Sequence, residues 1–185
     1  MKALYDLAGW KSALAALLAV LVFLGWLFPS HQAQMTAAAG QAVQPLDTRL
    51  AYTPAEVTAL FEALGSQGRQ VYATVAGRID MVFPLAYGAF FMLVLASLLK
   101  PLTAADSRLR LLAWLPLPGM AFDWLENARI LELLARYPQF STDAVAAAER
   151  ATRFKHATLL GCVALAAVLG LAVLLRRLQE RQWRA

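Results

Sequence analysis

Two long stretches without a charged residue limit most strongly what this chain can fold into. Residues 13–28 and residues 157–175 contain no Asp, Glu, Lys or Arg. A helix of about 20 apolar residues spans a hydrocarbon core of ~30 Å at 1.5 Å per residue. The composition agrees, because 60% of the chain is hydrophobic and only 16% is charged, unlike an ordinary soluble domain. The sequence therefore predicts an integral membrane protein.

Two further stretches extend this prediction to four spans. Residues 81–99 carry no charge, whereas residues 111–134 are apolar around four charged side chains. We predict an all-α fold in which residues 1–185 form a single integral membrane domain. It is a four-helix transmembrane bundle with spans at about 10–29, 80–99, 111–134 and 156–176. Residues 30–79 are expected to form an extracytoplasmic loop that contains a short amphipathic helical segment.

The distribution of basic residues predicts the orientation of the spans. The net charge is +5, and nine basic residues lie in short segments that the positive-inside rule places in the cytoplasm: Lys2, Lys11, Lys100, Arg108, Arg110, Arg176, Arg177, Arg181 and Arg184. Seven lie on the other side: Arg49, Arg69, Arg78, Arg136, Arg150, Arg153 and Lys155. We predict a multi-pass protein with both termini cytoplasmic, and we read the basic residues as topology signals rather than a nucleic-acid surface. The preference for Arg and Ala favours a bacterial inner membrane.

Several residues have simpler interpretations than a catalytic or metal site. The first apolar stretch is followed by Ala37–Ala39, but the gap is long for a cleaved signal peptide, so an uncleaved signal anchor is favoured. The single cysteine, Cys162, lies in an apolar stretch and is expected to pack there. His31 and His156 are the two histidines and lie far apart in sequence, so we expect neither a metal site nor a cofactor.

The predicted extracytoplasmic loop contains one well-defined helix start. Residues 30–50 read as a surface connection with at most a weak helix, because no apolar period is sustained. Thr53, Pro54 and Glu56 then form an N-cap, a first-turn proline and a capping box. Gly65 is expected to end that helix in a turn. The amphipathic helix is expected either to pack on the bundle or headgroup region, or to form a lid over a cavity.

The next helix is expected to start at Arg69 and to continue through Asp80 into the second span without a break. On that span four residues share one helical face, because they are spaced by four, three and four positions: Asp80, Pro84, Tyr87 and Phe91. The third span opens with Pro116 and Pro118, which should interrupt the helix. Behind them, four residues share one face: Asp123, Glu126, Asn127 and Ile130.

Depth relates the polar residues of the two spans. Because the second and third spans run in opposite directions, counting residues places Tyr87 level with Asp123, and Asp80 level with Arg129. Arg129 also lies three residues from Glu126 and from Glu132, within reach for helical ion pairs. A charge near the bilayer centre costs roughly 3 kcal/mol on lenient scales, so these side chains should face the bundle and have partners.

Two interpretations of these residues stay open. In the first, they form a structural clamp. In the second, they line an outer-half polar cavity for a lipid-like ligand or a membrane-protein partner, formed by Asp80, Tyr87, Asp123, Glu126, Asn127 and Arg129. The predicted function is a binding or accessory protein in contact with membrane lipids. The alternative is an intramembrane acid/base enzyme that uses Asp123 or Glu126 on a hydrophobic, lipid or sterol-like substrate.

About half of the chain resembles a family of uncharacterised four-helix bacterial membrane proteins. The resemblance rests on residues 52–56, the turn at residues 65–69, Tyr72, Asp80, residues 83–84, Tyr87 and residues 123–127. It implies the four-helix architecture and no known activity. The layout is also distantly similar to the sterol isomerase and sigma-2 receptor group, whose small membrane bundles carry acidic residues in a lipid-accessible cavity. No catalytic role is transferred from that group.

Overall fold

The computed structural model describes residues 2–183, and within that range the secondary structure is helical throughout. The α-helices, in chain order, are α1 (Lys2–Leu7), α2 (Trp10–Val22), α3 (Phe28–Ala39), α4 (Pro54–Thr74), α5 (Phe83–Leu99), α6 (Pro116–Arg136) and α7 (Thr142–Gln182). Two π-helical turns, η1 (Phe23–Leu27) and η3 (Val75–Ile79), and two 3-10 segments, η2 (Leu46–Thr48) and η4 (Arg108–Trp114), connect them.

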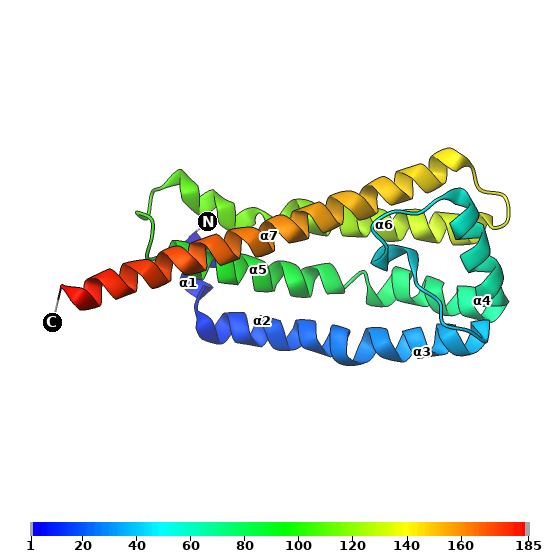
Figure 1. Cartoon of the computed structure of the whole chain (residues 1–185), viewed down its shortest axis with the longest axis horizontal. Coiled ribbons are helices and arrows are strands. Elements are labelled where there is room, and N and C mark those ends of the chain that lie inside the picture. Colours follow the sequence, from blue (N-terminus) through cyan, green and yellow to red (C-terminus); the bar gives the residue numbers. More distant parts are fainter. Residues whose placement is uncertain (1, 184–185) are drawn as a thin grey trace.

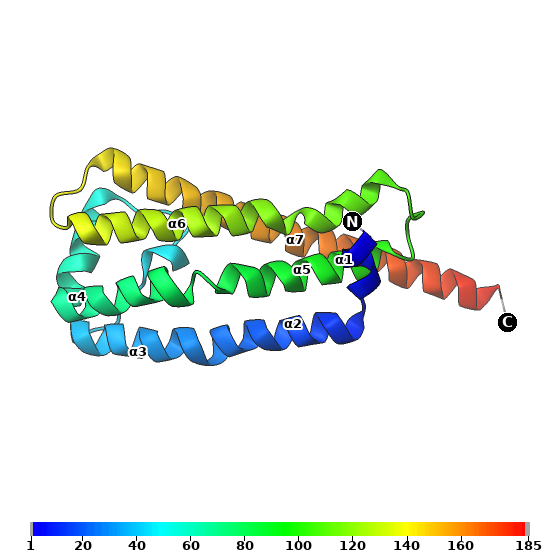
Figure 2. The same ribbon diagram turned by 180° about the vertical axis from the view of Figure 1, so that it is seen from behind.

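The longer helices α2, α3, α5, α6 and α7 lie lengthwise in an elongated bundle, whereas α1 and the first part of α4 lie across its two ends (Figures 1 and 2). Helix α2, the π-helical turn η1 and helix α3 form one continuous helix from Trp10 to Ala39, which we call the first rod. It packs through α2 on α5 and through α3 on α4, while α6 packs along α7. The C-terminal end of α7 projects beyond the other helices (Figures 1 and 2).

Two helices are long and apolar enough to cross a membrane: Trp10–Ala39 and Thr142–Gln182. In the most apolar 18-residue stretch of each helix, only 6% and 11% of the residues, respectively, are buried inside the protein. The exposed apolar side chains of these stretches need an apolar environment outside the protein. The pair Pro54–Ile79 and Phe83–Leu99, bent by 42°, makes a third span if it is counted as one. The structure thus supports a helical membrane protein with two or three candidate spans, whereas α6 carries too many charges to be recognised as a span.

The helix start at Thr53 has the predicted geometry. The Glu56 amide donates to Thr53 Oγ1 at 3.3 Å, and the Thr53 amide donates to Glu56 Oε2 at 2.7 Å. At Gly65 the backbone turns to φ 59° and ψ −172°, a conformation that is essentially restricted to glycine. The helix that begins at Pro54 therefore ends at Gly65, as predicted, and a second helical stretch follows the kink and runs to Thr74.

The connection that was predicted at residues 30–50, after the first span, is shorter than expected. Helix α3 continues to Ala39, well beyond the predicted end of the first span, and Gly40 ends it with φ 65°. The remaining residues 41–53 form an extended segment interrupted by η2. The weak apolar period of residues 30–39 was misleading because this helix packs against α4, which stabilises it without a strong apolar face of its own.

The predicted unbroken helix through Asp80 is wrong. The chain leaves the helix after η3 and resumes at Phe83 with a bend of 42°. Pro84 has no amide hydrogen, so the Asp80 carbonyl loses its normal helical donor four residues on. Asn127 Nδ2 donates to that carbonyl at 3.2 Å, and Trp124 Nε1 donates to the Met81 carbonyl at 2.9 Å. Two side chains of α6 therefore satisfy the backbone at this break.

A buried apolar core fills the end of the bundle near the break in α4. Its central members are Leu46, Val57, Phe61, Leu64, Tyr72, Ile130, Leu133 and Val145. They come from the extended segment and from α4, α6 and α7, so the loop region predicted to lie on the surface is packed onto the bundle. This packing positions the extended segment beside the polar residues of α6 and α7.

Candidate functional site

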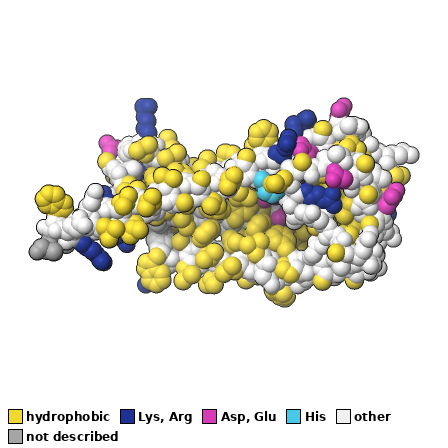
Figure 3. Space-filling model, viewed as in Figure 1, with side chains coloured by type: hydrophobic (Ala, Val, Ile, Leu, Met, Phe, Trp, Pro, Cys, Tyr) yellow, Lys and Arg dark blue, Asp and Glu magenta, His cyan; other side chains and the backbone are white. Residues whose placement is uncertain are grey.

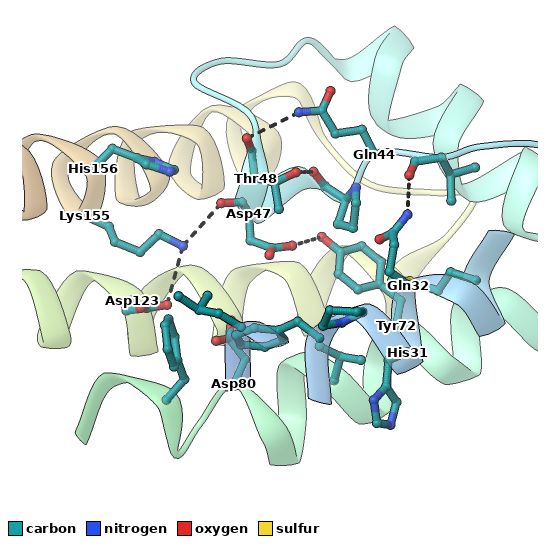
Figure 4. A pocket seen from close by; sticks show the side chains of 18 of the residues that line it. His31, Gln32, Gln44, Asp47, Thr48, Tyr72, Asp80, Asp123, Lys155 and His156 are labelled. Atoms are coloured by element: carbon teal, nitrogen blue, oxygen red, sulfur yellow. Dashed lines mark hydrogen bonds and ion pairs between the residues drawn. The ribbon is translucent and has the colours of Figure 1, made fainter. Parts of the chain in front are cut away.

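A cavity of about 740 Å³ lies between α3, the extended segment 41–53, the start of α5, and helices α6 and α7 (Figure 4). Its lining divides into two kinds of residue. The apolar members are Leu24, Phe28, Pro29, Met35, Val43, Pro45, Val75, Phe83 and Leu159. The polar members are His31, Gln32, Gln44, Asp47, Thr48, Tyr72, Asp80, Asp123, Lys155 and His156.

Asp123 lies on the inner face of α6 and is only 2% exposed. The Tyr87 hydroxyl donates to Asp123 Oδ2 at 3.0 Å, which confirms the predicted contact between the second and third spans. Lys155 Nζ lies 3.6 Å from Asp123 Oδ1, and that oxygen has no hydrogen-bond partner within residues 2–183. Tyr87 holds the Asp123 carboxylate through this hydrogen bond but does not itself line the cavity.

Glu126 is fully buried behind the cavity wall. It forms an ion pair with Lys155, and Thr152 Oγ1 donates to Glu126 Oε1 at 2.5 Å. Glu126 does not line the cavity. We expected Glu126 to pair with Arg129, but Arg129 pairs with Glu132 instead. The reason is that α7 packs along α6 and brings Lys155 and Thr152 onto the buried face of α6.

Lys155 is one of the side chains of the candidate site that sequence reasoning missed. It was counted only as a basic residue of an extracytoplasmic loop. The missed signal is a helical stripe of small or polar residues, Val145, Ala148, Thr152 and Lys155, spaced by three and four positions and all buried in α7. A lysine on such a stripe must point into the bundle.

Asp80 lies at the break between η3 and α5 and is 5% exposed. Its carboxylate lines the cavity and makes no hydrogen bond or ion pair with any residue that the structure describes. The neighbouring Asn127 is 1% exposed and is occupied with the Asp80 backbone carbonyl, so it orders the break rather than the cavity surface. Asp80 is therefore the carboxylate most available to a bound molecule.

Arg129 lies outside the site. Its side chain is 43% exposed, and its guanidinium pairs with Glu132 at 2.9 Å. This confirms the predicted Arg129–Glu132 pair, whereas the expected pairing of Arg129 with Asp80 is wrong. It borders a smaller hollow with Phe122, Arg150 and Phe154. Equal depth was misleading here, because Arg129 lies on a different face of α6 from Asp123 and Asn127.

The extended segment contributes Asp47, which no sequence pattern pointed to. The Tyr72 hydroxyl donates to Asp47 Oδ1 at 2.8 Å and accepts from the Leu46 amide at 2.9 Å. Lys155 Nζ donates to the Asp47 carbonyl at 3.4 Å (Figure 4). These contacts fix the segment over the polar end of the cavity.

A chain of polar contacts continues from Lys155 through Glu126 and Thr152 to the buried Tyr52 of the extended segment. Thr152 Oγ1 lies 3.1 Å from the Tyr52 hydroxyl and also contacts Glu126. Burial raises the pKa of Tyr52, so this hydroxyl stays neutral over the physiological range. Tyr52 therefore acts as a hydrogen-bonding partner that closes the polar cluster.

The cavity opens sideways between the first rod and α7. Figure 3 shows a hollow on this face, with hydrophobic side chains around it and acidic atoms in its depth. Leu24 and Phe28 border it from one side and Leu159 from the other. The helices that form this mouth are the two candidate membrane spans.

No protein-family model, curated protein or solved structure matches this chain. The resemblance to four-helix bacterial membrane proteins therefore stays a prediction. Within residues 2–183 no group of three or more His, Cys, Asp or Glu side chains has the arrangement to hold a metal ion. The function is consequently argued from the cavity alone.

Proposed function

We propose that this chain is a multi-pass membrane protein of the bacterial inner membrane, with four spans and both termini in the cytoplasm, whose cavity binds a lipid-like amphiphile. The observation that carries the proposal is the division of one cavity into an apolar mouth and a polar interior. An amphiphile needs both kinds of surface, whereas a structural clamp needs no open space.

The position of the mouth supports a ligand that enters from the bilayer. Leu24 lies within the first charge-free stretch and Leu159 within the last, whereas Lys155 lies just before the last stretch begins. The cavity therefore extends from the edge of the apolar zone into the polar end of the bundle. A hydrocarbon chain at the mouth would stay in an apolar environment while the head group reaches Asp80 and Asp123.

The dimensions also support binding. Ligand pockets commonly enclose about 300–1,000 Å³ and combine mostly apolar walls with a few polar groups that orient the ligand. A cavity of about 740 Å³ is in this range. Its polar groups are held by contacts between four separate parts of the chain, so the site is largely pre-formed.

The alternative of an intramembrane acid/base enzyme is favoured by one observation, the free Oδ1 of Asp123 beside the cavity. A general acid or base must reach its substrate within hydrogen-bond distance. Glu126 lies behind the wall and is paired with Lys155, so the enzyme proposal now rests on Asp123.

Filling the mouth tests the binding proposal. The protein is purified in a mild detergent, and the lipids that remain bound are identified by native mass spectrometry. Leu159→Trp places a large side chain in the cavity, whereas Leu160→Trp makes the same change at a neighbouring position that is 69% exposed. We expect the parent and Leu160→Trp to retain a stoichiometric amphiphile that Leu159→Trp loses. Equal retention by all three proteins, or none, would overturn the proposal.

A further inference from the structure

The cavity contains more carboxylates than cations. Asp47, Asp80 and Asp123 line it, and Lys155 is the one lysine or arginine among its described lining residues. Lys155 already contacts Glu126 and lies 3.6 Å from Asp123 Oδ1. The one lysine of the described lining is thus shared by two carboxylates before any ligand enters.

Asp47 and Asp80, the other two carboxylates that line the cavity, differ in their surroundings. Asp47 accepts a hydrogen bond from the Tyr72 hydroxyl at 2.8 Å. Asp80 is 5% exposed and has no side-chain partner within residues 2–183. His31 and His156, which also line the cavity, direct Nδ1 to the backbone carbonyls of Leu27 and Thr152. A buried carboxylate without a partner is costly, so the site favours a molecule that supplies a positive charge or a donor at Asp80.

Aromatic rings line the same cavity as this carboxylate. Phe28 and Phe83 both line the cavity and stack edge to face, with ring centroids 5.0 Å apart. Phe83 also packs against Tyr87 at 5.2 Å. The electron-rich faces of aromatic rings attract ammonium groups, and a desolvated site strengthens this attraction. A cavity lined by both a carboxylate and aromatic rings is therefore suited to an alkylammonium group and unsuited to an anionic one.

We propose that the amphiphile carries an amine or ammonium head group that binds at Asp80, with its hydrocarbon chain along Leu24, Phe28 and Leu159. This inference rests on the proposed binding function and adds the chemistry of the ligand. The ammonium group belongs either to a free long-chain amine or to the head group of a zwitterionic phospholipid.

The test compares three probes in a neutral maltoside detergent, with binding followed by native mass spectrometry of the full chain. The probes are hexadecylamine, hexadecanol with the same chain length, and lysophosphatidylethanolamine. We expect hexadecylamine to bind at least about tenfold more tightly than hexadecanol, the ratio given by roughly 1.4 kcal/mol. Comparable binding of lysophosphatidylethanolamine assigns the head group to a phospholipid, and its failure to bind assigns it to a free amine.

Variants separate this inference from the binding function itself. Asp80→Asn and Asp80→Ser should remove the preference for hexadecylamine and leave hexadecanol binding unchanged. Asp106→Asn makes the same charge change at an exposed position outside the cavity and should retain the preference. A preference that is absent from the parent, or that survives in both Asp80 variants, overturns the inference alone. If the parent binds none of the three probes, the binding function fails with it.

Discussion

Lys155 of α7 and Glu126 of α6 form an ion pair whose side chains are 8% and 0% exposed. The pair joins the two helices that pack most extensively in the bundle. It also connects the cavity to the protein interior, because Lys155 lines the cavity and Glu126 does not. Lys155 therefore belongs both to the structural clamp and to the cavity, which the sequence analysis treated as alternatives.

Lys155→Met should destabilise the protein strongly, because it leaves the Glu126 carboxylate buried without a counterion. Breaking a buried pair in this way typically costs about 3–5 kcal/mol. We expect a large fall in the thermal unfolding midpoint in detergent, and a similar fall for Glu126→Gln. Arg153→Met is the control on the same helix, because the Arg153–Glu149 pair is exposed at its arginine and should contribute less than about 1 kcal/mol.

A double variant separates lost pairing from lost packing. The double variant is compared with Lys155→Met alone and Glu126→Leu alone. Lys155→Met combined with Glu126→Leu removes both charges and should recover most of the stability that either of these single changes loses. If the double variant is as unstable as the sum of the single variants, the ion pair is not the reason for the destabilisation.

Gly65→Ala should destabilise α4 by about 1–3 kcal/mol, the cost of a residue with a Cβ in a sparsely populated backbone region. No atom lies within 4 Å of the added Cβ, so the effect isolates backbone strain from steric clash. Gly170→Ala is the matched control, because its surroundings are equally open and its φ is not positive. An equal effect of both substitutions on the unfolding midpoint would refute the strain argument.

Thr53→Ala should lower the free energy of unfolding by about 0.5–2 kcal/mol, because it removes the N-cap of α4. Thr58→Ala, inside the same helix, should have little effect or a slightly stabilising one. Hydrogen bonds from the Thr53 hydroxyl and amide lower the pKa of Glu56. A lowered carboxyl pKa stabilises the fold above the ordinary glutamate pKa, and this stabilisation is lost as the pH falls through the lowered value.

The stability difference between the parent and Glu56→Gln should therefore be largest at neutral pH and shrink in acid. Thermal unfolding of both proteins across a pH series measures it. A difference that grows in acid would contradict the assigned direction.

The proposed orientation places α4 on the extracytoplasmic side of the membrane and the end of α7 in the cytoplasm. These two regions lie at opposite ends of the molecule (Figure 1). In a Cys162→Ala background, a membrane-impermeant maleimide should label Gln67→Cys in intact cells and label Gln182→Cys only after permeabilisation. Both positions are exposed, so accessibility within the fold does not limit either reaction. The reverse labelling pattern would refute the proposed topology.

Local sequence signals predicted the features that depend on neighbouring residues. The capping box at Thr53, the break at Gly65 and the shared buried face of Asp123, Glu126 and Asn127 all follow from spacing along one helix. The Tyr87–Asp123 contact was also predictable, because two antiparallel helices brought these residues to one depth.

Features that depend on how helices rotate against one another could not be predicted in this way. Depth alone does not tell which face of α6 meets α7, so Glu126 was paired with Arg129 instead of Lys155. Asp47 lies on a segment without regular periodicity and is positioned by the Tyr72 hydroxyl from another helix. The break at Asp80 was predictable in principle from Pro84, but its stabilisation by Asn127 and Trp124 required the packed structure.

The origin of Lys155 in α7 has a consequence for the biogenesis of the protein. Asp47, Asp80, Asp123 and Glu126 all precede Lys155 in the chain, so α7 leaves the ribosome after the segments that carry these acidic residues. Until it arrives, the acidic groups have no lysine counterion from this site and should resist transfer into the bilayer. Insertion of α6 is therefore expected to await synthesis of α7, so that the two helices leave the translocation machinery as a pair.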